Sequence, residues 1–247
     1  MSKKEREVSL GGTRFLVINL TEPLREDLEV YPGDPRPIKE VFSDIKKTGY
    51  HHFMYKISDH SFHPHGDAPS HQNLSLQEKT FDTFDMDYFF NPSFMIDLSG
   101  SPDAEEFDGI RYLVRIKKEH IQKYSDLLSK KKALIIRTGY DRWLESNKKH
   151  NPKYIPYLTK EAGKFIASYD NIKVVGIDSL TVDTVGSHSV HQAFKNKLIV
   201  EGLVNLYSIP KRNRDKFDLQ TSTISIIGST GGPIAAFAYV KIDRPIR

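Results

Sequence analysis

The stretch KEHIQKYSDLLSKKKALIIRTG, residues 118–139, joins a helical pattern directly to a buried strand. Its first half, 118–129, repeats apolar side chains at the spacing of one helical face: Ile121, Tyr124, Leu127 and Leu128. Its second half, 133–139, is a continuous apolar run that ends in Arg-Thr-Gly, which predicts a strand buried on both faces. A helix that leads at once into a buried strand is typical of an α/β domain.

The same alternation continues on both sides of this stretch. Apolar runs predict strands at 93–98 and 174–178, and Thr159 is the expected N-cap of a second helix. Strands dominate the two ends of the chain, and we expect them at 15–20, 53–57, 223–227 and 235–242. No linker rich in Pro, Gly or Ser divides the sequence, so we predict one α/β domain over residues 1–247.

Composition excludes several classes of protein. The 36 Lys and Arg exceed the 32 Asp and Glu by only four, and they are spread along the chain, so we expect no nucleic-acid groove. The absence of cysteine excludes disulfides, thiolate nucleophiles and cysteine-ligated zinc. No apolar run reaches the length of a signal peptide or a membrane span, so we expect a cytoplasmic protein without a membrane partner.

The candidate catalytic and metal-binding side chains are concentrated in HSFHPHGDAPSH, residues 60–71, which holds four of the ten histidines and one aspartate. Imidazole nitrogens and carboxylate oxygens are the usual ligands of zinc and manganese. If the segment is extended, alternation places four side chains on one face: Ser61, His63, His65 and Asp67. His60 would then face the other side, and His71 would fold back after Pro69. The competing interpretation is a histidine-rich surface loop.

A second set of candidates lies downstream. His188 and His191 are three residues apart, as on one helical face, and Glu201 follows a short apolar run. Taken alone, these residues also fit a surface histidine and a helix-capping glutamate. Other chemistries have less support, because the chain has no G-x-S-x-G elbow and its glycine-rich segment 228–232 lacks the Lys-Ser/Thr ending of a phosphate loop. We expect a tight turn there.

These residues resemble the motif H-x-G-T-H-x-D-x-P-x-H of the cyclase-like metal hydrolases, a family that includes bacterial kynurenine formamidase and isatin hydrolase. The segment 65–71, HGDAPSH, matches the second half of the motif at every defined position. Weaker matches follow in the family's order: NLTEPL and YPGDP near the start, GIDSLTVD at 176–183, and His191 before EGLVNL at 201–206.

The resemblance implies a fold, a cofactor and roles for named residues. The fold would be a swivelling β/β/α domain with a mixed sheet and flanking helices, assembled as a homodimer or higher homo-oligomer. The metal, zinc or manganese, would be held by residues that include His65 and Asp67. His71 stands at the position of a second ligand or catalytic base, and His191 and Glu201 match the remaining ligand and acid/base positions.

The chain departs from the motif at one ligand. The first histidine of the family falls on Ser61, and its Gly-Thr falls on His63-Pro64. Serine is a poor zinc ligand, so we expect His63, on the same face of an extended segment, to complete the metal site. The alternatives are that His60 replaces the missing ligand after a shift, or that metal binding is weakened.

The activity that the resemblance implies is metal-dependent hydrolysis of an amide, as in the conversion of N-formylkynurenine to kynurenine and formate. Tyr31, Phe62 and Phe90 are candidates for an apolar wall against an aryl substrate, although packing would also explain them. The alternatives are hydrolysis of another cyclic amide, ester or lactone, and a catalytically impaired member that binds a small molecule.

Overall fold

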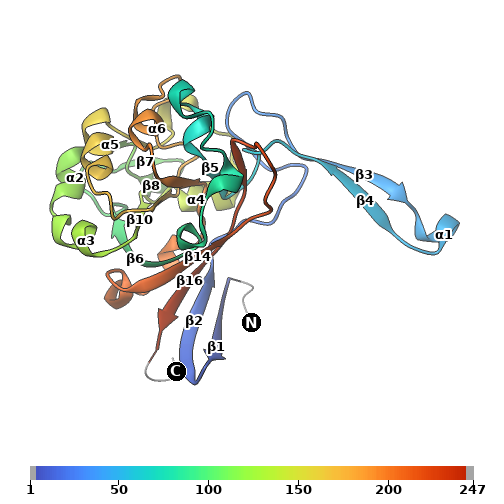
Figure 1. Ribbon diagram of the computed structural model, residues 1–247, viewed down its shortest axis with the longest axis horizontal. Coiled ribbons are helices and arrows are strands. Elements are labelled where there is room, and N and C mark those ends of the chain that lie inside the picture. The colour runs from blue at the N-terminus through green and yellow to red at the C-terminus, as the bar shows by residue number, and fades with distance from the viewer. Residues whose placement is uncertain (1–3, 243–247) are drawn as a thin grey trace.

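A ten-stranded mixed sheet forms the framework of the computed structural model, which describes residues 4–242 (Figure 1). Its strands, in spatial order, are β1 (Glu5–Leu10), β2 (Thr13–Asn19), β16 (Ala235–Lys241), β14 (Phe217–Ser222), β6 (Phe90–Asp97), β10 (Ala133–Arg137), β12 (Val174–Ile177), β13 (Leu198–Glu201), β5 (His65–Asp67) and β15 (Gly231–Pro233). Strand β5 thus lies between two strands that come from the last quarter of the sequence. This order brings the two candidate motifs together.

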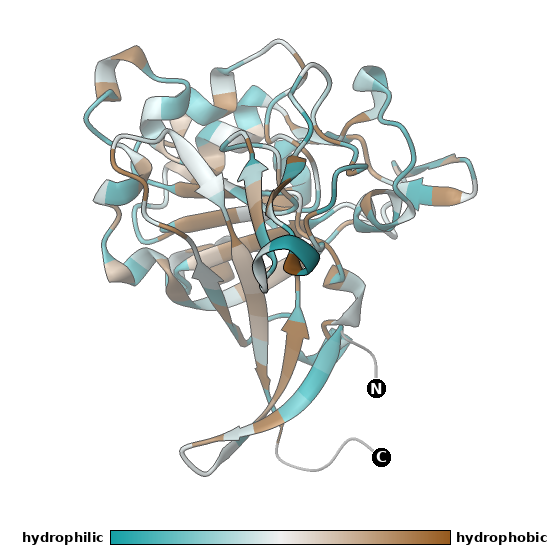
Figure 2. Ribbon diagram, turned by 90° about the vertical axis from the view of Figure 1, so that its right-hand side faces the viewer, coloured by the Kyte–Doolittle hydropathy of each residue, from teal (hydrophilic) through white to brown (hydrophobic). Residues whose placement is uncertain are grey.

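The centre of the sheet is parallel and covered on both faces. Strands β6, β10, β12 and β13 run parallel, and every residue of β10 is buried. One face packs against a layer of helices, seen beside the sheet in Figure 1: α2 (Lys118–Gln122), α3 (Ser125–Lys130), α5 (Lys160–Ala167) and α6 (Ser189–Ala193). On the other face, Ile135 and Val200 share a buried cluster with the antiparallel strands β2, β14 and β16. Figure 2 shows hydrophobic residues gathered in the sheet, with mixed or hydrophilic helices and loops around it.

These observations confirm the predicted α/β class with a mixed sheet and flanking helices, and they correct two elements. The helix expected over 118–129 is interrupted at Tyr124, and it restarts at Ser125-Asp126, residue types that favour helix starts. The strand expected over 223–227 is wrong, because the strand lies earlier, in β14. There polar Asp218 and Gln220 alternate with buried side chains: Phe217, Leu219 and Thr221.

The remaining elements are short. Three small two-stranded sheets pair β3 (Ile38–Ser43) with β4 (His52–Lys56), β7 (Glu105–Phe107) with β8 (Ile110–Tyr112), and β9 (Arg115–Ile116) with β11 (Tyr157–Leu158). Two further α-helices are α1 (Ile45–Thr48) and α4 (Asp141–Ser146). The 3-10 turns are η1 (Pro69–His71), η2 (Leu74–Leu76), η3 (Phe81–Thr83), η4 (Met86–Tyr88), η5 (Pro152–Tyr154), η6 (Leu206–Ser208) and η7 (Lys211–Asn213).

Across residues 4–242, no helix combines the length and apolar character that crossing a membrane requires. The single domain expected over residues 1–247 stays a prediction, and its two ends, 1–3 and 243–247, lie outside the described residues.

A buried carboxylate ties the ends of the central strands together. Asp178, just after β12, accepts hydrogen bonds from the backbone N–H groups of Thr138 and Gly139, which follow β10. Gly139 has φ +104, in the region that favours glycine, and a Cβ built there would lie 2.7 Å from the carbonyl oxygen of Arg111. Both the backbone angle and the space require glycine at this position.

We therefore expect Gly139→Ala to lower the free energy of unfolding by roughly 1–3 kcal/mol, because the substitution combines backbone strain with overpacking. The matched control is Gly100→Ala, where an added Cβ meets no atom within 4 Å. Urea denaturation of the two variants and the parent would measure the difference. Equal stabilities for the two variants would contradict the role assigned to Gly139.

Candidate metal and active site

Four histidines and two carboxylates form a cluster in a cavity of about 230 Å³ at the edge of the sheet: His60, His65, Asp67, His71, His191 and Glu201. They come from β5, β13, α6, η1 and the segment that precedes β5. The antiparallel register pairs His65 with Glu201, and so fixes two of the six by backbone hydrogen bonding. Gly66, between His65 and Asp67, has no room for a side chain, because a Cβ would lie 2.8 Å from the ring of Phe81.

Three of the histidines are oriented in the same way. Each ring has its Nδ1 held by an oxygen outside the cluster: the carbonyl of Phe62 for His65 (3.0 Å), the carboxylate of Asp183 for His191 (2.8 Å), and the carboxylate of Asp59 for His60 (2.9 Å). Because a carbonyl oxygen only accepts, His65 carries a proton on Nδ1, so Nε2 is the nitrogen that can bind a metal when the ring is neutral. Metal-binding histidines are held by outer partners in this way.

The three Nε2 atoms point at two buried carboxylates. His60 Nε2 lies 3.1 Å from Asp67 Oδ1, and His65 Nε2 lies 3.3 Å from Glu201 Oε2. His191 Nε2 is nearly equidistant from both carboxylates, at 3.3 Å from Asp67 Oδ2 and 3.4 Å from Glu201 Oε1. The result is a compact shell of nitrogen and oxygen donors around Asp67.

This donor set fits a divalent cation. His60 Nε2 and Asp67 Oδ1 are both buried and form an ion pair at 3.1 Å, but the geometry of this contact is not that of a hydrogen bond, which most buried polar groups make. Two groups have donor atoms within 4.8 Å of one another: His60, Asp67 and His71, and His65, Asp67 and Glu201. Asp67 belongs to both groups. Imidazole donors suit zinc and carboxylate donors suit manganese, so this mixed set does not select between the two ions.

Charge pairing in the cluster is strong. Burial lowers the pKa of His60 and of His191, but hydrogen bonds and charge pairing with neighbouring carboxylates outweigh it and raise each pKa to about 10. Burial raises the pKa of Asp67, but the surrounding histidines hold it well below its usual range. Burial and the charge of Asp67 raise the pKa of Glu201. The carboxylates thus have histidine protons as their partners when no metal is bound.

His71 differs from these histidines. Its ring centroid lies 4.1 Å from that of His60 and 5.8 Å from that of His191, so it faces the cluster. Burial, opposed by Asp67 but reinforced by the neighbouring histidines, lowers its pKa to about 4. A neutral imidazole at this position can act either as a metal ligand or as a base.

The structure brings together five of the six residues predicted from the sequence and leaves out His63. The segment before β5 is not a continuous strand: residues 59–60 form a turn, residues 62–64 form a bend, and the strand begins only at His65. His63 lines a separate, apolar cavity, where burial lowers its pKa to about 3. His60, expected on the opposite face, occupies the cluster instead, and the hydroxyl of buried Ser61 donates to the carbonyl of Pro35 at 2.6 Å.

Two orienting carboxylates were not predicted as site residues. Asp59 holds His60 and also accepts a hydrogen bond from Thr230, and Asp183 accepts from the backbone N–H groups that begin α6 as well as from His191. The signal for Asp59 in the sequence is its position next to a histidine. His188 is not a partner of His191 on the helix, because it is the N-cap of α6 and its ring contacts Gln72 at the rim.

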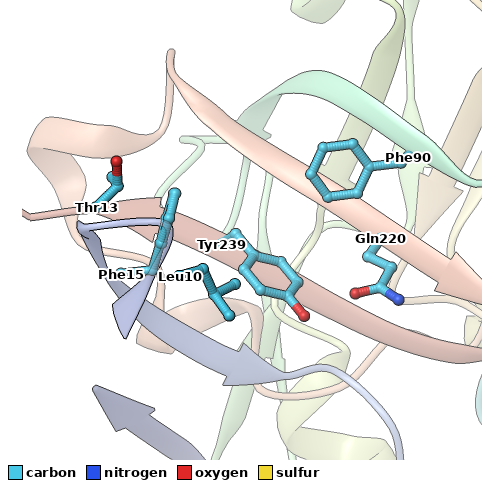
Figure 3. A pocket seen from close by; sticks show the side chains of 6 residues that line it. All are labelled: Leu10, Thr13, Phe15, Phe90, Gln220 and Tyr239. Atoms are coloured by element: carbon cyan, nitrogen blue, oxygen red, sulfur yellow. The ribbon is translucent and has the colours of Figure 1, made fainter. Parts of the chain in front are cut away.

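A second hollow, of about 390 Å³, lies over the antiparallel end of the sheet (Figure 3). Aromatic side chains dominate it: Tyr239 packs edge-on against Phe15 at 6.0 Å and against Phe90 at 6.1 Å. Within residues 4–242, the side chains that line this hollow include no histidine and no acidic residue. Phe90 is therefore not a wall of the cluster cavity, and neither is Phe62, whereas Tyr31 does line that cavity.

Comparison with protein-family models gives a match to the family described as "Putative cyclase" over residues 18–184, more than half of the chain. This match confirms the family resemblance inferred from the motifs. A search of curated proteins finds no match.

Solved structures with the same fold include two isatin hydrolases. Isatin hydrolase A from Labrenzia aggregata, bound to benzyl benzoate, has a TM-score of 0.73 and 20% identity, covering 92% of this chain and 94% of that one. An isatin hydrolase bound to the product analogue thioisatinate has a TM-score of 0.74 and 18% identity, covering 92% of each chain. A protein described as a predicted metal-dependent hydrolase, from Bacillus stearothermophilus, has a TM-score of 0.66 and 18% identity, covering 90% of this chain and 97% of that one. At these identities the likeness establishes the fold, and it confirms the predicted class.

The arrangement of the histidines predicts how single substitutions change metal affinity. We expect His60→Ala to weaken zinc or manganese binding by at least about tenfold, which removes about 1.4 kcal/mol of metal-dependent stabilisation. His63→Ala should leave the affinity unchanged, because His63 lies outside the cluster. The measurement is the increase in melting temperature on adding metal, taken relative to each variant without metal. A loss of that increase in His63→Ala but not in His60→Ala would reverse the assignment.

Proposed function

The chain belongs to the cyclase family, and on that basis we propose that it is a metal-dependent hydrolase of amide or cyclic amide bonds in an aryl substrate. The observation that carries this proposal is the convergence of the Nε2 atoms of three histidines on two buried carboxylates, with each histidine held from outside the cluster through its Nδ1. Such a donor set favours an ion that supplies hydrolytic chemistry over a purely structural salt bridge.

The side chains of the cluster divide into holding and proton-transfer roles. His60, His65, Asp67 and Glu201 would hold the ion through Nε2 and carboxylate oxygens, and His191 would contribute Nε2 from α6. When bound, a divalent ion polarises the scissile carbonyl and acidifies water. Asp59 and Asp183 keep the His60 and His191 rings in place by accepting from Nδ1.

His71 is the best-placed base, because its ring faces the cluster and burial lowers its pKa, which leaves the imidazole unprotonated and able to accept a proton. It would take a proton from the attacking water as the new C–O bond forms, and return that proton to the nitrogen as the C–N bond breaks. Hydrolysis of an N-formyl amine in this way yields formate and the free amine. The pair His191 and Glu201 is the second candidate for this proton transfer.

The lining of the cavity supports an aryl substrate. Tyr31 and Leu180 line it together with the polar cluster, and they offer apolar surface in the same cavity. N-formylkynurenine is the substrate that we propose. Isatin, a cyclic amide, is the second candidate, because two structures with the same fold are isatin hydrolases. A cyclic ester would suit the same groups.

The proposal predicts metal-dependent turnover. Protein stripped with a chelator should be inactive towards N-formylkynurenine and isatin, and zinc or manganese should restore hydrolysis of at least one of them. Absorbance of substrate and product would follow the reaction. Metal-loaded protein that binds either compound without hydrolysing it would instead support the impaired, small-molecule-binding alternative.

A single substitution tests whether His71 acts in catalysis without contributing to the stability of the fold. We expect His71→Ala to lower kcat by roughly 100-fold or more, the usual contribution of a general base, without lowering the melting temperature. His120→Gln is a matched control far from the cavity, since glutamine can still accept from the backbone N–H of Lys117 at the start of α2. Full activity in His71→Ala would exclude it as the base.

A further inference from the structure

One carboxylate in the wall of the cluster cavity has no role in the hydrolysis proposed above. Asp34 lines this cavity, and its carboxylate lies close enough to His60 and His65 to interact with their charges when those rings are protonated. Asp34 is partly buried, but among residues 4–242 its side chain has no hydrogen-bond or ion-pair partner. Partial burial leaves this charge with less water to stabilise it, so a positively charged ligand would be favoured beside it.

The loop that carries Asp34 is held in place from two sides. The backbone N–H of Asp34 donates to the carbonyl of Tyr31 at 2.9 Å, which closes a turn. The carbonyl of Pro35 accepts from the buried hydroxyl of Ser61 at 2.6 Å, and Ser61 directly follows His60. The serine that replaces a histidine of the family motif thus fixes the loop beside the cluster. A group held in this way loses little conformational freedom when it binds a ligand.

Negative charge dominates the cavity once a metal is bound. A metal takes neutral imidazoles as ligands, so the histidines then contribute no charge. Asp67 and Glu201 together match the two positive charges of one divalent ion, and Asp34 adds a third negative charge to the lining. No lysine or arginine of the described chain, residues 4–242, lines this cavity. An ammonium group beside Asp34 would balance the charge, whereas a ligand carboxylate would find neither cationic side chain there.

We propose that Asp34 binds an ammonium group of the aryl ligand, so that the cavity selects aryl amides with a positively charged side chain. This inference rests on the proposed hydrolase function and names the contact that determines its specificity. Tyr31 and Leu180 offer the apolar surface for the ring, and Asp34 offers the charge. N-formylkynurenine carries an ammonium group and isatin carries none, so Asp34 favours the first of these substrates.

Three aryl ketones separate the ammonium group from the rest of the ligand. Kynurenine carries an ammonium and a carboxylate, kynuramine carries the ammonium alone, and ortho-aminoacetophenone carries neither. We expect metal-loaded protein to bind the first two at least about tenfold more tightly than the third, a difference of about 1.4 kcal/mol. Isothermal titration calorimetry measures the three affinities without requiring turnover.

The matched variant Asp34→Asn keeps the shape of the side chain and removes its charge. It should abolish the preference for the two ammonium compounds and leave the affinity for ortho-aminoacetophenone unchanged. Asp34→Glu keeps the charge and should retain most of the preference. Asp87→Asn is the control, because Asp87 is exposed and does not line the cavity. Circular dichroism checks that every variant is folded.

Turnover gives a second measurement of the same contact. In Asp34→Asn the KM for N-formylkynurenine should rise by at least about tenfold while kcat changes by less than about twofold, because a binding interaction remote from the reacting bond is lost. The N-formyl derivative of ortho-aminoacetophenone has the same scissile bond without the ammonium. Its kcat/KM should be the same in the parent and in Asp34→Asn.

The two measurements separate this inference from the proposed function. A parent that hydrolyses neither formamide but loses its preference for ammonium compounds in Asp34→Asn would support the ammonium site and overturn the hydrolase function. Hydrolysis with equal affinities for the three ketones would overturn the ammonium site alone. So would a preference that persists in Asp34→Asn, a preference for kynurenine that kynuramine does not share, or no detectable binding of either ammonium compound to the parent.

Discussion

The buried carboxylate of Asp67 is the constraint on which the arrangement of the site depends. A charge in the interior costs several kcal/mol unless partners compensate it. Asp67 finds those partners in His60 and His191, with His65 at a longer distance of 3.8 Å. They reach it from different segments, so the fold has to bring β5, α6 and the chain before β5 to one point. The strand order, with β5 between β13 and β15, achieves this.

The central layers of the fold were predictable because their signals are local. The continuous apolar run of β10 can only be satisfied by cover on both faces, and the N-cap at Thr159 is a single-residue signal that the structure confirms. The antiparallel end was harder to predict. In β14, Asp218 and Gln220 interrupt the apolar side chains, whereas the more continuous apolar run at 223–227 is a loop. Whether such a segment becomes a strand with one buried face or an exposed loop depends on which other segments pack against it. The sequence of the segment alone does not show those contacts.

The site was predictable where the spacing of residues along a strand determines to which face their side chains point. His65 and Asp67 lie two residues apart on β5 and both reach the cluster, as alternation requires. His63 and His60 could not be placed in this way, because the turns that precede β5 break the alternation. His60 enters the cluster because Asp59 anchors its ring, and Ser61 turns away to the carbonyl of Pro35. These contacts depend on tertiary structure that no spacing rule describes.

The elements that carry the cluster differ from those that surround it. His65, Asp67 and Glu201 are on paired strands, whereas Tyr31, Asp34 and Gly186 at the cavity wall are on loops. Backbone hydrogen bonding between β5 and β13 holds His65, Asp67 and Glu201 whatever the loops contain. Loops tolerate substitution and insertion more readily than the strands they connect. Related chains can therefore diverge in the molecules that they accept, and even in a ligand carried by a turn, such as His60, while the donor atoms on the paired strands stay in place.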